Sequence, residues 1–200
     1  MRSEILLVLL LASSIPLVAQ QQTRTYVVNY KGDDIGTLKL QQFISGDTIH
    51  YKMSSDIKTR FIFTIHVKSF EESVFKNGRL LYSTVNRTVN GNEKVKRQTR
   101  AGTNTVGANT YTLLNDGKSV VLNNEGIGYN LMRMYCLEPI NISRVYSDNY
   151  QQFLPITKIR QHTYKIVLPD GNYNYYSYTN GICTKVEVFN SMYKMEMTLR

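Results

Sequence analysis

The chain has few of the residues that build disulfide frameworks, metal sites and catalytic centres. Its 200 residues include no tryptophan, four prolines, two cysteines and three histidines. Two cysteines allow at most one bond within the chain, so the fold cannot rest on a disulfide framework. The sequence also lacks an H-E-x-x-H motif, a G-x-S-x-G motif and a glycine-rich phosphate loop. We therefore predict a protein with no cofactor, no metal site and no catalytic residues, and not an enzyme.

Acidic residues are scarce relative to basic ones. The chain has 24 Lys and Arg against 15 Asp and Glu, a formal net charge of +9. Such a charge attracts anionic surfaces, so an anionic envelope component is a candidate partner, whereas no nucleic acid is expected. The densest basic patch comprises Lys94, Lys96, Arg97 and Arg100. We interpret it as a solvated strand that deters edge pairing, with phosphate or sulfate binding as the alternative.

A long apolar run occurs only at the N-terminus. Arg2 precedes an apolar run from Ile5 to Ala12, and Ala19 offers a small residue for cleavage. The run is shorter than the roughly 20 residues of a membrane-spanning helix. No cysteine follows it to accept a lipid. We expect residues 1–19 to be a signal peptide, with cleavage after Ser14 as an alternative, and residues 20–200 to be one periplasmic domain without a transmembrane or lipid anchor.

Long helical periods are absent, whereas Asn-Gly and Asp-Gly pairs recur between short runs of alternating residues. These pairs favour two-residue hairpins, because type I′ turns need positive φ at both central positions. The pattern predicts an all-β fold, in which a single antiparallel meander of about 10–12 strands curls into a barrel or half-barrel. The five pairs are Asn77-Gly78, Asn90-Gly91, Asp116-Gly117, Asp170-Gly171 and Asn180-Gly181.

One segment departs from the strand pattern. Apolar residues recur at helical spacing from Ile127 to Glu138, just before Pro139. We predict a short helix at 127–138, then an irregular connection from Asn141 to about Pro155 that covers one end of the barrel. Strands are expected at 24–30, 35–44, 47–58, 60–76, 79–89, 92–101, 108–115, 118–123, 162–169, 172–179, 182–189 and 192–199.

The last hairpins predict which side chains face the interior. If Asp170-Gly171 and Asn180-Gly181 are both central turn residues, alternation places six apolar side chains on one face. Small barrels are either filled by side chains or hold one small ligand. We expect a lipid-like or other hydrophobic ligand in the interior. The candidate ligand-binding residues are Ile166, Leu168, Tyr173, Tyr175, Val186 and Val188.

The opposite face of these hairpins carries Cys183 with Tyr176, Tyr178 and Lys185. Cys136 and Cys183 are a candidate disulfide, because oxidising compartments let such bonds persist. Closing this loop stabilises by about 4 kcal/mol in the chain-entropy model, and two separate thiols are the alternative. Two alternative functions stay open, namely an integral outer-membrane β-barrel, whose strands also alternate, and an envelope enzyme that uses the Cys183 face.

Three segments together resemble a known family. They are YKGDDIG at 30–36, GRLLYS at 78–83 and YYSYTNGIC at 175–183. The chain is similar in these segments to an uncharacterised family of exported β proteins from Bacteroidota-type Gram-negative bacteria, a domain of unknown function. The resemblance implies a periplasmic, barrel-like β protein. It implies no established activity and no catalytic residues.

Overall fold

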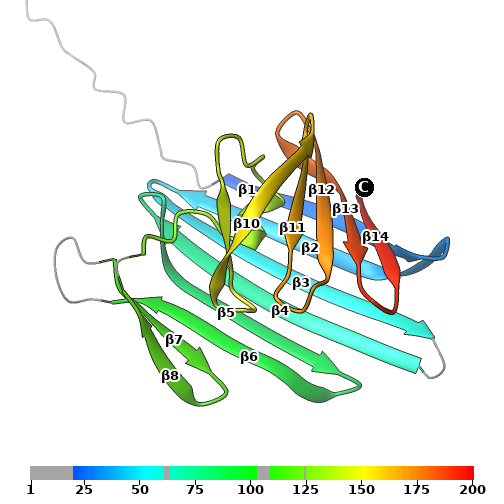
Figure 1. The fold of residues 1–200 in the computed structure, drawn as a ribbon, viewed down its shortest axis with the longest axis horizontal. Coiled ribbons are helices and arrows are strands. Elements are labelled where there is room, and N and C mark those ends of the chain that lie inside the picture. The colour runs from blue at the N-terminus through cyan, green and yellow to red at the C-terminus, as the bar shows by residue number, and fades with distance from the viewer. Residues whose placement is uncertain (1–19, 61–63, 103–108, 124) are drawn as a thin grey trace, which may run out of the picture.

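The computed structural model describes residues 20–60, 64–102, 109–123 and 125–200. The predicted signal peptide, residues 1–19, lies outside them. The described chain is dominated by one antiparallel sheet (Figure 1). Its strands are β1 (Gln20–Tyr30), β2 (Asp33–Ser45), β3 (Thr48–Arg60), β4 (Thr64–Lys76), β5 (Arg79–Val89), β6 (Asn92–Ala101), β7 (Tyr111–Asn115), β8 (Lys118–Leu122), β9 (Arg144–Ser147), β10 (Gln152–Arg160), β11 (Thr163–Val167), β12 (Tyr173–Thr179), β13 (Ile182–Phe189) and β14 (Lys194–Leu199).

The sheet has 14 strands in the order β8-β7-β6-β5-β4-β3-β2-β1-β14-β13-β12-β11-β10-β9. Strands that follow one another in sequence pair from β1 to β8 and from β9 to β14. β1 also pairs with β14, so the first and the last strand lie next to each other inside the sheet. In Figure 1 the long strands β2–β4 pass behind β10–β14, which cross them at a steep angle. The order ends at β8 and β9, so the sheet is curled but not closed. The predicted antiparallel meander is confirmed in its half-barrel form.

Two strands appear where an irregular connection was expected. β9 and β10 pair with each other between residues 144 and 160. Pro155 lies within β10 and weakens the strand pattern, because proline cannot donate to the ladder. Its partner β9 is only four residues long and forms one edge of the sheet. With β9 and β10 the sheet has 14 strands, more than the predicted 10–12.

Four of the five Asn-Gly or Asp-Gly pairs form the expected turn. Asn77, Asn90, Asp116 and Asn180 have φ between 48° and 51°, and the glycine after each also has positive φ. Both central positions therefore fit a type I′ turn. These four hairpins are confirmed as two-residue connections between neighbouring strands.

Asp170-Gly171 forms a different turn from the one predicted. Only Gly171 has positive φ, at 83°, and the amide of Leu168 donates to the carbonyl of Asn172 at 2.7 Å. The loop thus contains three residues, 169–171, a length that typically ends in a left-handed glycine. Tyr173 consequently pairs with Val167 and not with Leu168. This one-residue slip moves the strand's side chains to the other face.

The next hairpin contains a second irregularity. Tyr178 pairs with Cys183 as the type I′ turn requires, but the register shifts between Ser177 and Tyr178. Tyr176 and not Tyr175 then faces Val186. The prediction that Tyr173 and Tyr175 share the apolar face is therefore wrong. Both lie on the outer face, where the Tyr173 ring stacks on Phe189 at 4.8 Å between centroids.

A short helical segment fills part of the space between the two halves of the sheet. Helix α1 (Leu131–Met134) is shorter than the predicted 127–138, and Asn130 caps its N-terminus. Met132 and Met134 are buried in the same core as residues from both halves of the sheet. The Tyr135 ring contacts Tyr26 from β1 and Tyr176 from β12 edge-on. The segment therefore acts as an internal plug. Among the described residues, no helix is long and apolar enough to cross a membrane.

The sheet separates an apolar inner face from a charged outer face. In β3, Tyr51 and Met53 point inward and are buried. His50, which has the opposite parity, points outward and lies 2.5 Å from a carboxylate oxygen of Glu72. His66 similarly contacts Asp56 at 2.6 Å. Both histidines therefore point outward, and each contacts a carboxylate on the neighbouring strand.

Candidate functional site

The inner face holds an apolar groove of about 460 Å³ between β2–β5 and β14. It exists because β3 and β4, each 13 residues long, extend past the plug. Next to the plug, inward side chains such as Tyr51 and Phe75 are buried, whereas farther along Ile57 and Val67 stay partly exposed. The groove is also lined by Leu38, Ile65, Met195 and Met197. A concave apolar surface of this kind is typical of a ligand site.

A second space, the polar chamber, adjoins the groove and has a volume of about 400 Å³. The two spaces share Met53, Glu71, Arg87, Tyr135 and Tyr193 in their walls. The chamber is otherwise lined mainly by polar groups from the 147–150 turn and from β12, together with the loops that flank it. The inner face thus offers two adjoining spaces, one apolar and one polar, that share part of their walls.

Glu71 and Arg87 form the boundary between the two parts. Their side chains come from adjacent strands, β4 and β5, and the Arg87 guanidinium lies 3.6 Å from a Glu71 oxygen. Burial raises the pKa of Glu71, and the charge of Arg87 opposes this rise. Sequence reasoning missed Glu71, although alternation reveals it, because it has the same parity as the inward-facing Val67 and Phe75.

Asp148 is the most deeply buried carboxylate of the polar chamber, with an exposed fraction of 5%. One of its oxygens, Oδ2, accepts a hydrogen bond from the Asn130 amide at 2.8 Å. Burial raises the pKa of Asp148 to about 7, the charge of Glu71 adds to the rise, and the Ser83 hydroxyl and Asn130 amide oppose it. No pattern in the sequence predicted this residue, because it lies in the stretch expected to be irregular.

The predicted ligand-binding residues fall in three different places. Ile166 and Val186 are fully buried in the core. Leu168 and Val188 line the polar chamber. Tyr173 and Tyr175 lie on the outer face, where the Lys165 ammonium sits 4.1 Å from the Tyr173 ring centroid. None of the six lines the apolar groove.

A family model of a domain of unknown function, DUF6134, matches residues 26–200. The chain belongs to the DUF6134 family. This confirms the resemblance to an uncharacterised domain family. Comparison with curated proteins gives no match.

The DUF6134 fold is similar to that of a solved structure from another family. This is the crystal structure of a beta-barrel-like protein of the domain of unknown function DUF1849, from Brucella abortus. The TM-score is 0.56 at 10% sequence identity, and the match covers 92% of this chain and 96% of that chain. At this identity the similarity shows the fold alone.

Both cysteines of this DUF6134 protein are free thiols in the structure, and the disulfide between them stays a prediction. Burial raises the pKa of Cys136 to about 11 and that of Cys183 to about 12. The grouping of Cys183 with Lys185 is wrong, because the register shift in this hairpin turns Lys185 outward. Its ammonium instead contacts Glu196 at 2.7 Å. Cys183, with Tyr176 and Tyr178, lies in the core.

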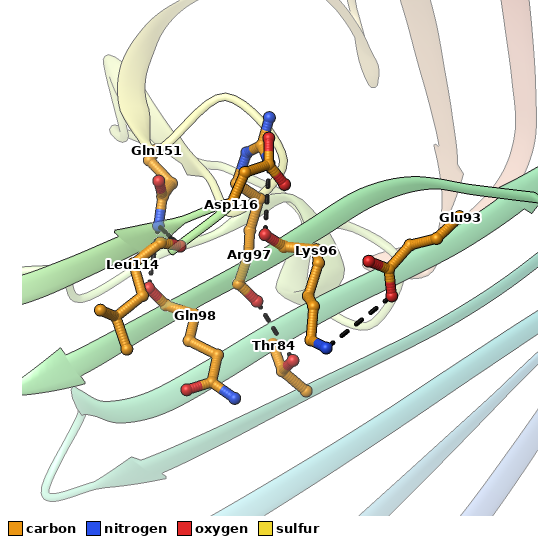
Figure 2. A network of polar contacts seen from close by, with 8 residues as sticks. All are labelled: Thr84, Glu93, Lys96, Arg97, Gln98, Leu114, Asp116 and Gln151. Atoms are coloured by element: carbon orange, nitrogen blue, oxygen red, sulfur yellow. Dashed lines mark hydrogen bonds and ion pairs between the residues drawn. The ribbon is translucent and has the colours of Figure 1, made fainter. Parts of the chain in front are cut away.

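The basic patch lies on β6, and its charges have local partners (Figure 2). Arg97 donates to Asp116 at 3.0 Å, and Lys96 lies 3.9 Å from Glu93. The Arg100 guanidinium lies over the Tyr82 ring, 5.2 Å from its centroid. Lys94 is exposed, at a register shift between β5 and β6. These contacts favour the interpretation as a solvated strand over a preformed anion site.

A further cavity of about 610 Å³ lies where the segment after α1 meets the turn between β10 and β11. Glu138, which is 6% exposed, lies within it. The His162 ring contacts this carboxylate at 3.0 Å, and the Tyr164 hydroxyl donates to it at 2.8 Å. Two partners on one buried carboxylate indicate a clamp that fixes the connection to the hairpin. Sequence reasoning missed the pair because 24 residues separate His162 from Glu138.

Proposed function

We propose that this DUF6134 protein is an exported, periplasmic, non-enzymatic binding protein that holds a hydrophobic ligand in the apolar groove. The observation that carries the proposal is the row of partly exposed apolar side chains along the inner face, with Ile57 and Val67 at its centre. Ligand pockets span about 300–1,000 Å³, and the groove falls in that range. Each buried methylene of a ligand contributes about 0.8 kcal/mol, so an alkyl chain is a suitable occupant.

The polarity of the sheet favours this proposal over an integral outer-membrane barrel. A membrane barrel presents an apolar band outward and polar groups inward. In this chain the outer face carries ion pairs such as Lys52 with Glu72 and Lys185 with Glu196, whereas the inner face holds the apolar core and the apolar groove. Recovery in the soluble fraction after osmotic shock tests the periplasmic location, and recovery in the outer-membrane fraction contradicts it.

An envelope enzyme that uses Cys183 is also less favoured. The thiolate is the reactive form of cysteine, and a pKa raised to about 12 keeps Cys183 protonated at neutral pH. Its side chain is fully buried as well. Binding without chemistry is therefore the function that the inner face supports best.

Native mass spectrometry of the protein, purified without detergent from the envelope of its source bacterium, tests ligand binding. The proposal expects an additional mass that organic extraction removes and that behaves as a lipid-like molecule. The variant Val67→Trp fills the groove and should lose the added mass. Phe70→Trp is the matched control, because Phe70 is 42% exposed and has the opposite parity on the same strand. Absence of any bound molecule, together with no binding of added alkyl compounds, would contradict the proposal.

A further inference from the structure

We infer that the ligand is a cationic amphiphile, with its alkyl chain in the apolar groove and a protonated amine in the polar chamber. The inference rests on the proposed function and adds the chemistry of the head group. Three features of the chamber carry it: its position beside the groove, its charge and its unpaired hydrogen-bond acceptors.

The groove and the chamber share wall residues, so they lie side by side, and the inferred ligand spans the boundary between them. Met53 and Tyr135 belong to both walls, as does the ion pair of Glu71 with Arg87. An alkyl chain held against Val67 and Met197 therefore leads toward Glu71 and the carboxylates beyond it. A ligand that enters the chamber needs a polar end, because its lining is predominantly polar.

The chamber has an excess of negative charge in a protein that is positive overall. Its charged lining residues are Glu71, Asp148, Asp170 and Arg87, so three formal negative charges and one positive charge give −2. The guanidinium is already paired with Glu71. Among the described residues, neither Asp148 nor Asp170 forms an ion pair. A cationic group is the ligand chemistry that compensates this charge.

Two buried amide oxygens of the chamber lack hydrogen-bond donors. The Oδ1 atoms of Asn149 and Asn174 complete no hydrogen bond among the described residues. Asp148 beside them interacts with the Asn130 amide and the Ser83 hydroxyl, and all three residues line the chamber. Buried acceptors without partners are costly, and an ammonium group supplies three donors and no acceptor. A carboxylate head group supplies none, and an alcohol supplies one.

Aromatic rings also line the chamber. Tyr150, Tyr176 and Tyr193 are among its lining residues, and the Tyr150 hydroxyl donates to Asp170 at 3.0 Å. The faces of tyrosine rings attract cations. The combination of carboxylates, acceptor oxygens and aromatic rings is suited to an ammonium group and unsuited to an anion.

The test compares dodecylamine, dodecanol and dodecanoate, each below its micelle concentration, by displacement of a hydrophobic fluorophore from the full-length mature protein. At pH 8 the amine is protonated, and we expect it to bind at least tenfold more tightly than dodecanoate, with dodecanol between them. Asp148→Asn should remove most of this difference, and Asp170→Asn should reduce it. Asp56→Asn, a carboxylate variant on the outer face, should leave it unchanged.

The pH dependence gives a second readout. Asp148, whose pKa burial raises to about 7, faces Glu71, the Ser83 hydroxyl and the Asn130 amide. Arg87, Asp170 and the ring of Tyr150 also line its chamber. Since the cation binds the ionised carboxylate, dodecylamine affinity should fall about tenfold from pH 8 to pH 6. Dodecanol affinity should change little.

The possible results separate the inference from the proposed function. If none of the three compounds binds and Val67→Trp changes nothing, the proposed function fails. If all three bind alike, or dodecanoate binds best, and Val67→Trp blocks them, the groove binds alkyl chains but the amine inference is overturned. Preference for the amine that survives in Asp148→Asn and Asp170→Asn also overturns the assignment of the ammonium to the polar chamber.

Discussion

Replacing Asp148 by asparagine should stabilise the unliganded protein at neutral and alkaline pH. The substitution keeps the size of the side chain and an oxygen that accepts from Asn130, the residue that donates to Asp148 at 2.8 Å. It removes the charge from a group that is 5% exposed and that forms no ion pair among the described residues. The variant therefore loses an electrostatic cost and little packing.

The magnitude follows from the pKa of Asp148, which burial raises from 3.8 to about 7. Well below pH 3.8 the side chain is protonated in both the folded and the unfolded state, and it contributes no difference. As the pH rises toward 7, the unfolded state ionises first, so the folded state becomes relatively less stable. A pKa difference of about three between the two states corresponds to roughly 4 kcal/mol. Wild-type protein should lose most of this amount relative to Asp148→Asn between pH 4 and pH 7.

Urea denaturation followed by circular dichroism at pH 4, 5, 6, 7 and 8 measures this difference. Glu71, whose pKa burial also raises, is present in both proteins, so its own burial cost cancels in the comparison, whereas its repulsion of the Asp148 carboxylate is part of the measured difference. We expect the two free energies of unfolding to agree near pH 4 and to diverge until about pH 7. A constant difference across the series, or a variant that is less stable at pH 8, would refute the assignment of a buried, destabilised carboxylate at Asp148.

Three further predictions concern the ion pair, a glycine and a thiol. Arg87→Met leaves the carboxylate of Glu71 without its ion-pair partner. Urea denaturation at pH 8 should show a free energy of unfolding lower by about 3 kcal/mol, and adding Glu71→Gln should restore part of it. Gly36→Ala should lower the melting temperature far more than Gly32→Ala. Both glycines have positive φ, but only at Gly36 would the new Cβ lie against a backbone oxygen, that of Asp56, at 2.1 Å. Cys183, with a pKa raised to about 12, should react with a disulfide reagent at pH 8 at least about a hundredfold more slowly than a free thiol, and rapid labelling of the native protein would contradict its burial.

The sequence predicts the hairpins of this fold well because their turns are local. Asn180-Gly181 determines its own backbone conformation, and the type I′ geometry follows from two residues. Asp170-Gly171 is the same dipeptide as Asp116-Gly117, which forms a type I′ turn, but Pro169 precedes it and the loop has three residues. A turn of that length changes the register by one residue, which is enough to exchange Tyr175 for Tyr176 on the inner face. Dipeptide identity alone does not distinguish these two turns.

The candidate site was less predictable than the fold, for reasons that differ between its residues. Glu71 and Arg87 interrupt the apolar face of predicted strands, so alternation along the sequence is enough to mark them as inward-facing charges. Asp148 carries no such mark, because its burial depends on packing between a turn and the strands of the other half. The groove itself depends on how far β3 and β4 extend past the plug, a difference in length between segments distant in sequence.

The polar chamber contains buried groups that lower the stability of the unliganded fold, and their presence supports a binding function. A neutral side chain in place of Asp148 would make the unliganded fold more stable. Asp148 is buried beside Glu71, and the acceptor oxygens of Asn149 and Asn174 lack donors, so several destabilising groups lie in one cavity. Proteins tolerate such costs mainly at functional sites, where a ligand compensates them on binding. A cation with several donors would relieve both the charge and the missing hydrogen bonds, so the features that weaken the unliganded fold are the ones that select the proposed ligand.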